Sequence, residues 1–426
     1  MQRLSKGKRA YGYIKAAPDD FIVEEITKSG VTLERDRRYF REELAEPEAP
    51  GSSEPRFSVF VMQKRDWNTA QALREVAKRC GRGIKSAGFA GSKDRTSVST
   101  QLCSMFGAKP ERLLSIHIKD ISINGAWESA TGIGLGDLLG NRFCIKVSDG
   151  SSLERISEIN AELGGIFPNY YGEQRFGARN NNAAVGLCII KGDFEGAVRS
   201  LLMDFTGERS EEAIYARKRL AEEMDFRDAL EYFPKYLKSE RMVLASLAEN
   251  PSDYAKAIRR LPRAITLMFV HSVESEIFNK ALEARMRDGQ IQPRAGELAC
   301  ASGTMGFPCI SKSFVSTGLH EAGQFALGNI VGYNSENLSE EETALLEGLG
   351  ITKEDFKVKH MPELNCKGTT RPLFAPYVSF AFSGETVSFS LPAGSYATVL
   401  INELLEITEP KGEQSRQSTG DSANAL

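Results

Sequence analysis

The chain has 426 residues, of which 41% are hydrophobic and 26% charged, and its formal net charge at pH 7 is −3. Its length allows two or three globular domains with ordinary cores. No apolar run reaches the length of a membrane span, and the basic N-terminus lacks the apolar segment of a signal peptide. We therefore expect a cytoplasmic protein that does not bind a membrane.

Cysteine and histidine spacing argues against metal chemistry. The seven cysteines include no Cys-x-x-Cys pair, and the four histidines are far apart in the sequence. Neither a zinc signature nor a histidine-based triad can be built from such spacing. We expect reduced, structural thiols and no metal.

The first third of the chain predicts a β-rich domain with one well-formed helix. Strands are expected at residues 11–14, 21–26, 57–63, 97–106, 113–118, 121–123 and 141–147. The helix follows the third of these strands. It begins at Asn68, with Gln71 three residues on, and ends at Gly81.

The middle of the chain is helical, and strands return near its end. Helices are expected at residues 182–190, 194–203, 211–224, 232–248 and 264–287. Residues 377–382 and 386–391 form a hairpin pattern, and a last helix spans 397–406.

This order predicts an α+β fold in which a mixed, mainly antiparallel-sheet domain is interrupted by a large, helix-rich α+β insertion. The first domain would comprise residues 1–166 and 377–408, and the insertion residues 167–376. Residues 409–426 are polar and are expected to be disordered. Both junctions would meet at the mouth of a cleft between two lobes, where substrates commonly bind.

A short turn between the helix and the fourth strand has the composition of a reactive site. It reads Gly91-Ser92-Lys93-Asp94-Arg95 and places one carboxylate between two cations. A rigid loop of this kind could hold Asp94 as a nucleophile, with Lys93 and Arg95 keeping it ionised. An ordinary surface turn is the alternative. The spacing fits neither a P-loop nor a dinucleotide fingerprint.

Positive charge is concentrated in the first part of the chain. Between Arg56 and Lys119 there are thirteen Lys and Arg residues against four acids. Such clusters supply the salt-sensitive part of nucleic-acid affinity. A solvated helix face is the alternative, because Arg74, Lys78, Arg82 and Lys85 fall near helical spacing.

Several separate motifs together resemble one family. They are Lys15-Ala16-Ala17-Pro18-Asp19-Asp20-Phe21, the Asp94 turn with Gln101 downstream, Gly140-Asn141-Arg142-Phe143, residues 169–177 (NYYGEQRFG) and residues 391–397 (LPAGSYA). In this order they resemble the TruD family of tRNA pseudouridine synthases. The Ser302-Gly303-Thr304-Met305-Gly306 segment of the middle part follows the family pattern only loosely.

The resemblance implies a catalytic domain with an inserted TRUD domain that isomerises the uridine at position thirteen of tRNA without a cofactor. By resemblance Asp94 is the nucleophile and Phe143 stacks on a flipped-out base, and we expect the protein to act as a monomer on tRNA held in a basic cleft between the lobes.

The remaining candidate residues each have a structural alternative. Asn141 shares a strand face with Phe143 and could fix a base edge, or could simply begin the strand. Lys15 could pair with Asp94 or a phosphate, or be a solvated lysine. Gln174 and Arg175 could hold phosphate, or belong to a structural hinge. Phe143 itself could be an ordinary core residue.

Two other functions remain possible from the residues alone. A basic cleft of this kind could bind folded RNA as a chaperone without chemistry, or the protein could be an enzyme of small phosphorylated molecules. Loss of uridine isomerisation in an Asp94→Asn variant would distinguish catalysis from binding.

Overall fold

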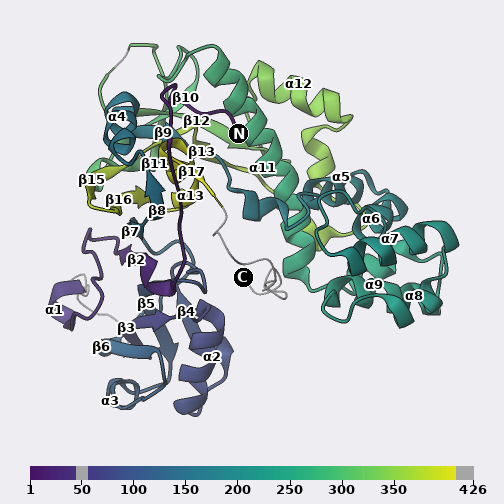
Figure 1. The fold of residues 1–426 in the computed structure, drawn as a ribbon, viewed down its shortest axis with the longest axis horizontal. Helices are drawn as coiled ribbons and strands as arrows, with labels where there is room; N and C mark the ends of the chain where they lie inside the picture. Colours follow the sequence, from purple (N-terminus) through teal and green to yellow (C-terminus); the bar gives the residue numbers. More distant parts are fainter. Residues whose placement is uncertain (45–55, 320, 409–426) are drawn as a thin grey trace.

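The computed structural model describes residues 1–44, 56–319 and 321–408 and shows a mixed α+β fold (Figure 1). Its largest sheet has the strand order β15-β16-β7-β2-β5-β3-β6, with β4 paired to β5. All neighbours in it are antiparallel except β2 and β5. The predicted mainly antiparallel sheet is therefore confirmed. The predicted tail at 409–426 lies outside the described residues.

The strands of this sheet come from both ends of the described chain. They are β2 (Phe21–Ile26), β3 (Phe57–Arg65), β4 (Ala87–Phe89), β5 (Val98–Phe106), β6 (Ile121–Ser129), β7 (Gly140–Lys146), β15 (Val378–Ser383) and β16 (Thr386–Pro392). Helix α2 (Thr69–Arg79) covers one face, where Leu73 and Val76 pack against Phe60 and Met62. Asn68 caps this helix by accepting a hydrogen bond from the Gln71 amide, as predicted.

Smaller elements complete this part of the molecule. They are α1 (Arg41–Leu44), α3 (Pro110–Leu114), α4 (Glu154–Leu163), α13 (Ala397–Leu404) and the three-stranded sheet of β1 (Ala10–Tyr13), β8 (Ser148–Ser151) and β17 (Leu405–Ile407). The strand predicted at residues 113–118 is wrong. Pro110 occupies the first turn of α3, where its fixed φ and missing amide favour a helix start.

The middle of the chain forms a helical cluster followed by a second sheet. Its helices are α5 (Asn182–Lys191), α6 (Phe194–Leu202), α7 (Glu211–Glu223), α8 (Phe226–Tyr232), α9 (Lys238–Glu249), α10 (Tyr254–Arg259), α11 (Arg263–Arg287) and α12 (Glu340–Leu349). The sheet has the order β11 (Pro308–Val315), β10 (Leu298–Ser302), β12 (Gln324–Ile330) and β13 (Thr369–Pro372). Figure 1 shows the helical cluster to one side of the two sheets.

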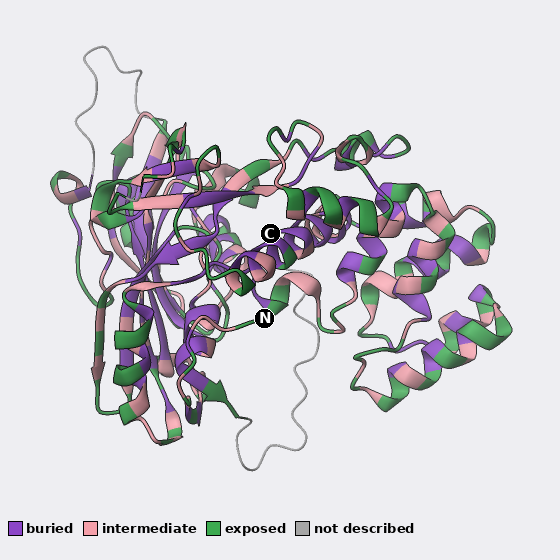
Figure 2. Ribbon diagram, turned by 90° about the horizontal axis from the view of Figure 1, so that it is seen from above, coloured by how far each residue is buried: buried purple, intermediate pink, exposed green. Residues whose placement is uncertain are grey.

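The two segments predicted as junctions lie side by side. Strand β9 (Ile166–Pro168) pairs antiparallel with β14 (Phe374–Pro376), so the chain leaves and re-enters the first part at one place. The two parts nevertheless share one hydrophobic core. In it Phe278 and Ala326 of the middle part pack in the same buried cluster as Phe143 and Phe389 of the large sheet. Figure 2 shows the strands and the long helix as mostly buried.

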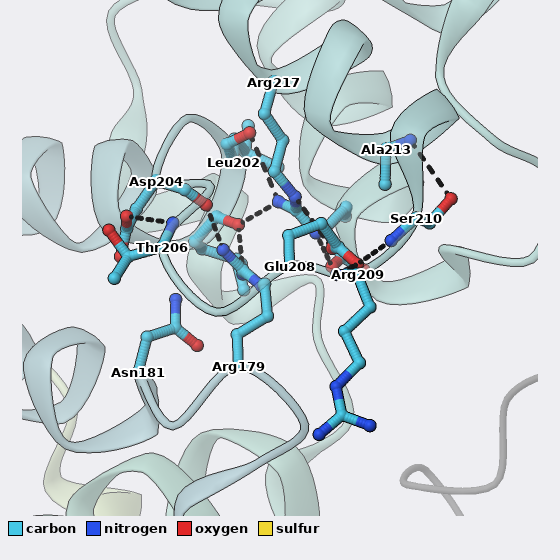
Figure 3. A network of polar contacts seen from close by, with 12 residues as sticks. Arg179, Asn181, Leu202, Asp204, Thr206, Glu208, Arg209, Ser210, Ala213 and Arg217 are labelled. Carbon is cyan, nitrogen blue, oxygen red and sulfur yellow. Dashed lines mark hydrogen bonds and ion pairs between the residues drawn. The ribbon is translucent and has the colours of Figure 1, made fainter.

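A buried arginine ties three helices of the middle part together (Figure 3). The Arg217 side chain on α7 is fully buried. Its guanidinium donates to the carbonyl of Leu201 at 2.7 Å and pairs with Glu240 at 2.9 Å and Glu208 at 3.4 Å. A planar group with five donors can satisfy a carbonyl at a helix end and two carboxylates at once. Arg217 thus fixes the end of α6 against α7 and α9.

Candidate active site

The Asp94 turn lies between β4 and β5, over one face of the large sheet. Strand pairing places Phe143, Val23, Ser99 and Lys64 in one row across β7, β2, β5 and β3. Residues paired in register share a face, so these side chains line one surface below the turn.

Three main-chain positions of the turn are held by buried side chains. Gln101 donates to the carbonyl of Gly91 at 3.1 Å, and Thr69 Oγ1 accepts from the Lys93 amide at 2.9 Å. Lys64 Nζ and Ser97 Oγ each donate to the Asp94 carbonyl at 2.8 Å. The backbone of the turn is therefore fixed independently of the Asp94 side chain.

Lys93 is not an exposed partner of Asp94, and that interpretation of the sequence is wrong. Its side chain is 4% exposed and pairs at 2.6 Å with Glu25, whose side chain is 1% exposed. Glu25 also accepts a hydrogen bond from the Leu102 amide at 2.9 Å. Because it points into the protein, Lys93 anchors the turn and is not available to a substrate. Arg95 likewise faces Asp66, at 3.3 Å.

The cation beside Asp94 is Lys15, which comes from a loop far away in the sequence. Its Nζ lies 2.7 Å from the Asp94 carboxylate, whose side chain is 47% exposed. The same ammonium lies 4.1 Å from the centre of the Phe21 ring. Lys15 also has φ of 64°, a left-handed conformation that is unfavourable for a lysine and is concentrated at functional sites.

Phe143 lies near this pair but is largely enclosed. Its ring is 6.2 Å from Phe21 and 5.6 Å from Phe389, and the residue is 7% exposed. On the same strand the side-chain oxygen of Asn141 is buried and has no hydrogen-bond partner among the described residues. A buried acceptor without a partner is costly. Asn141 pairs in register with Glu25 of β2, and its role in substrate binding stays a prediction.

Gln174 and Arg175 lie on the 3₁₀ turn Glu173–Phe176, beside a different set of groups. Gln174 is exposed, and the Arg175 guanidinium lies 5.3 Å from the Tyr171 ring. Within the described residues neither has a recorded contact with the Asp94 turn. Their role in substrate binding stays a prediction.

The segment that carries these two residues meets the 391–397 motif at a buried arginine. Arg371 donates to the carbonyl of Asn169 at 3.1 Å and to the carbonyl of Gly394 at 2.8 Å. Its guanidinium also lies 4.4 Å from the Tyr171 ring. Ser395 in turn donates to the Asn169 side chain at 2.9 Å. Two motifs more than 200 residues apart thus form one junction.

Three residues important to this geometry were missed at the sequence level. They are Phe21, Glu25 and Lys64. A signal for Glu25 did exist, because a carboxylate inside the apolar run Phe21–Ile26 would be buried and would need a cation. Lys64 gave none, because a lysine near the end of a strand is typical of a solvated edge.

Lys64 gives the fold a pH dependence that can be measured. Burial lowers its pKa to about 7, although the Asp94 charge opposes this. The unfolded chain then binds more protons than the folded one from about pH 7 upward, so this group adds stability as pH rises. The parent's free energy of unfolding, measured with urea, should therefore rise relative to that of Lys64→Met as the pH increases from about 6.5 to 9. A pH-independent difference would contradict this assignment.

One group of possible metal ligands lies elsewhere among the described residues. His271, Glu274 and Cys366 place their ligand atoms within 4.8 Å of one another. His271 and Glu274 already form a 2.6 Å contact, and burial raises the pKa of the Cys366 thiol well above its usual range. Further contacts join the cluster, because Cys366 Sγ lies 3.9 Å from His271 Nδ1 and 3.4 Å from the Leu364 carbonyl oxygen.

Comparisons with known proteins agree on one family. A sequence model of tRNA pseudouridine synthase D (TruD) matches residues 2–404. A protein of Methanopyrus kandleri, named probable tRNA pseudouridine synthase D, is 36% identical over 360 residues and covers 82% of this chain and 85% of its own. One of that name from Thermococcus sibiricus is 33% identical over 433 residues, with 95% and 97% covered. A TruD crystal structure from Methanosarcina mazei has a TM-score of 0.73 at 29% identity, and the match covers 95% of both chains.

Among the helices that the structure describes, none combines the length and the apolar character needed to span a membrane.

Proposed function

We propose that this chain, which belongs to the TruD family and is a tRNA pseudouridine synthase, uses Asp94 as the nucleophile in converting a tRNA uridine to pseudouridine. The observation that carries the assignment is the exposed Asp94 carboxylate on a turn whose backbone is held by Lys64, Gln101 and Thr69. A fixed, accessible carboxylate beside a cation is the arrangement that covalent catalysis by aspartate requires.

The reaction is an isomerisation, so it needs no external oxidant or reductant, and no atom of the uridine is lost to another molecule except the exchanging proton. The bond between N1 of uracil and C1′ of ribose breaks, the base rotates, and a bond forms between C5 and C1′. C5 loses a proton and N1 gains one, so atoms and electrons balance. Asp94 would begin the sequence by attacking either the uracil ring or C1′.

Before the reaction, the Lys15 ammonium would stabilise the Asp94 carboxylate. It would then move away from the carboxylate when Asp94 attacks the substrate. The ammonium already contacts the Phe21 ring, so a small movement could leave it over that ring or bring it to a phosphate. Its left-handed backbone is consistent with a side chain held for such a task.

The uridine must leave its stack to reach Asp94, at a cost of a few kcal/mol. Stacking on an aromatic ring returns roughly 1–3 kcal/mol. We propose that the Phe143 ring, which meets Phe21 edge to face, supplies this contact after local rearrangement. The unpartnered Asn141 oxygen could accept a hydrogen bond from uracil N3–H.

We further propose that residues 167–376 form an inserted TRUD domain on a catalytic domain made of residues 1–166 and 377–408. The pairing of β9 with β14 supports this division, although the two parts share a core. The enzyme would act as a monomer in the cytoplasm, with tRNA held between the two parts.

The uridine at position thirteen is the proposed target, and a transcript experiment tests it. A tRNA transcript incubated with the purified protein should gain one pseudouridine, mapped by carbodiimide labelling and primer extension. A transcript with cytidine at that position should gain none. Modification of a different uridine in both transcripts would overturn the position while leaving the activity intact.

A further inference from the structure

Helix α2 and the segment that follows it carry four exposed cations that the reaction itself does not use. Arg74, Lys78 and Arg82 are spaced four residues apart, and Lys85 follows. All four are exposed. Within residues 1–44, 56–319 and 321–408, none of them forms an ion pair with a carboxylate. We call these four residues the α2 stripe.

Some exposed cations on the helices of the middle part pair with an acid one turn away, as in Arg199 with Glu195 and Arg219 with Glu223. Among the described residues, Arg74 and Lys78 of α2 form no such ion pair. Like charges at four-residue spacing instead destabilise a helix by about 0.2–0.5 kcal/mol per pair. The chain thus tolerates a small cost on α2, which a bound polyanion would remove.

The stripe begins close to the Asp94 turn. Thr69 in the first turn of α2 bonds both the Lys93 amide and Gln101, so the helix starts at the turn itself. At about 1.5 Å per residue, Arg74 and Lys78 lie roughly 8 Å and 14 Å along the helix from Thr69, and Arg82 and Lys85 follow beyond its end at Arg79. In Figure 1, α2 lies on the side of its sheet turned toward the helical cluster.

The far end of the stripe opens onto a shallow hollow with an aromatic wall. The hollow has a volume of about 540 Å³, and Lys85, Phe57 and Phe106 line it together with residues 132–134. Phe106 is 47% exposed, and its ring meets that of Phe57 edge to face with 5.3 Å between the ring centroids. Cations leading to an exposed ring are the combination that binds single-stranded nucleic acid.

We propose that the α2 stripe binds the sugar-phosphate backbone of the tRNA next to the reacting uridine. This rests on the proposed function, since it takes the Asp94 turn as the place where the uridine is held. Each phosphate contact releases condensed counterions, so the stripe supplies affinity that weakens as salt rises. It carries no base specificity, because cations on phosphates position the RNA without reading it.

The test removes three of the charges and measures binding separately from chemistry. Arg82 is left in place because it donates to the Gly107 carbonyl. The variant R74Q/K78Q/K85Q should bind a tRNA transcript at least 10-fold more weakly near 0.15 M salt, by fluorescence anisotropy. The slope of log Kd against log salt should fall by about 2 to 3, from roughly 0.7–0.9 per phosphate contact. The loss should appear in Kd rather than in the single-turnover rate at saturating tRNA.

A matched variant removes equal charge elsewhere. K312Q/K359Q/K367Q changes three exposed lysines of the middle part. If it weakens binding and lowers the salt slope as much as the stripe variant does, the effect is one of net charge and the proposal is overturned. An unchanged slope in the stripe variant also overturns it. Failure of the proposed function would look different, because the parent protein would then bind tRNA without forming pseudouridine.

Discussion

Asp94→Asn is expected to lower pseudouridine formation by about 10⁴-fold or more, which is the scale of loss when a covalent nucleophile is removed. Asn has the same shape but cannot form the covalent intermediate. The backbone of the turn should stay in place, because Lys64 and Ser97 hold the Asp94 main-chain carbonyl and not its side chain. The variant should therefore fold normally and still bind tRNA.

Tritium release from tRNA labelled at C5 of uridine measures this directly, and anisotropy with the same tRNA measures binding. Asp66→Asn is the matched control, since Asp66 is 49% exposed and pairs with Arg95 on the same side of the turn. Normal release by the Asp94 variant would refute the nucleophile assignment. Binding without release by the parent protein would instead favour the RNA chaperone.

The location of the site could be predicted from the sequence, and the pairing of Lys15 with Asp94 was one of its interpretations, but the pairing of Lys93 with Glu25 could not be predicted. A Gly-rich turn between a helix and a strand identified Asp94 and its place at the edge of a sheet. Lys93 was misread because a lysine next to a reactive aspartate is indistinguishable from an exposed one without knowing the side-chain direction. Glu25, its partner, lies 68 residues away on another strand, and only the parallel pairing of β2 with β5 brings the two together.

The element pattern shows a similar limit. The long helix at 264–287 and the late hairpin were predicted nearly to their ends, because their periodicity is sustained. The helix predicted at 232–248 begins only at Lys238 as α9, because α8 ends at Tyr232 and Pro234 lies between the two helices. Proline disfavours a helical conformation in the residue before it, a local effect that outweighs apolar spacing. The helix predicted to Glu406 ends at Leu404, where the chain turns to pair as β17 with β1.

Lys93→Met is expected to destabilise the fold by about 3–5 kcal/mol, the usual cost of removing one partner from a buried ion pair. The change leaves the Glu25 carboxylate, 1% exposed, without its counter-charge beneath the turn. Urea unfolding at neutral pH measures the loss as a lower midpoint with an unchanged slope. Because the same lysine holds the turn above the sheet, activity should fall further than the unfolded fraction accounts for.

A second substitution separates the buried charge from the lost packing. In E25Q/K93M, Gln keeps an oxygen for the Leu102 amide while the charge that Lys93 balanced is gone. Replacing both members of a buried pair by neutral groups is often close to neutral in stability. The double variant should therefore be more stable than either single one, and a double-mutant cycle should give a large coupling energy. If the two losses simply added, Lys93 and Glu25 would be acting independently, and the turn would owe its position to Thr69, Gln101 and Lys64 alone.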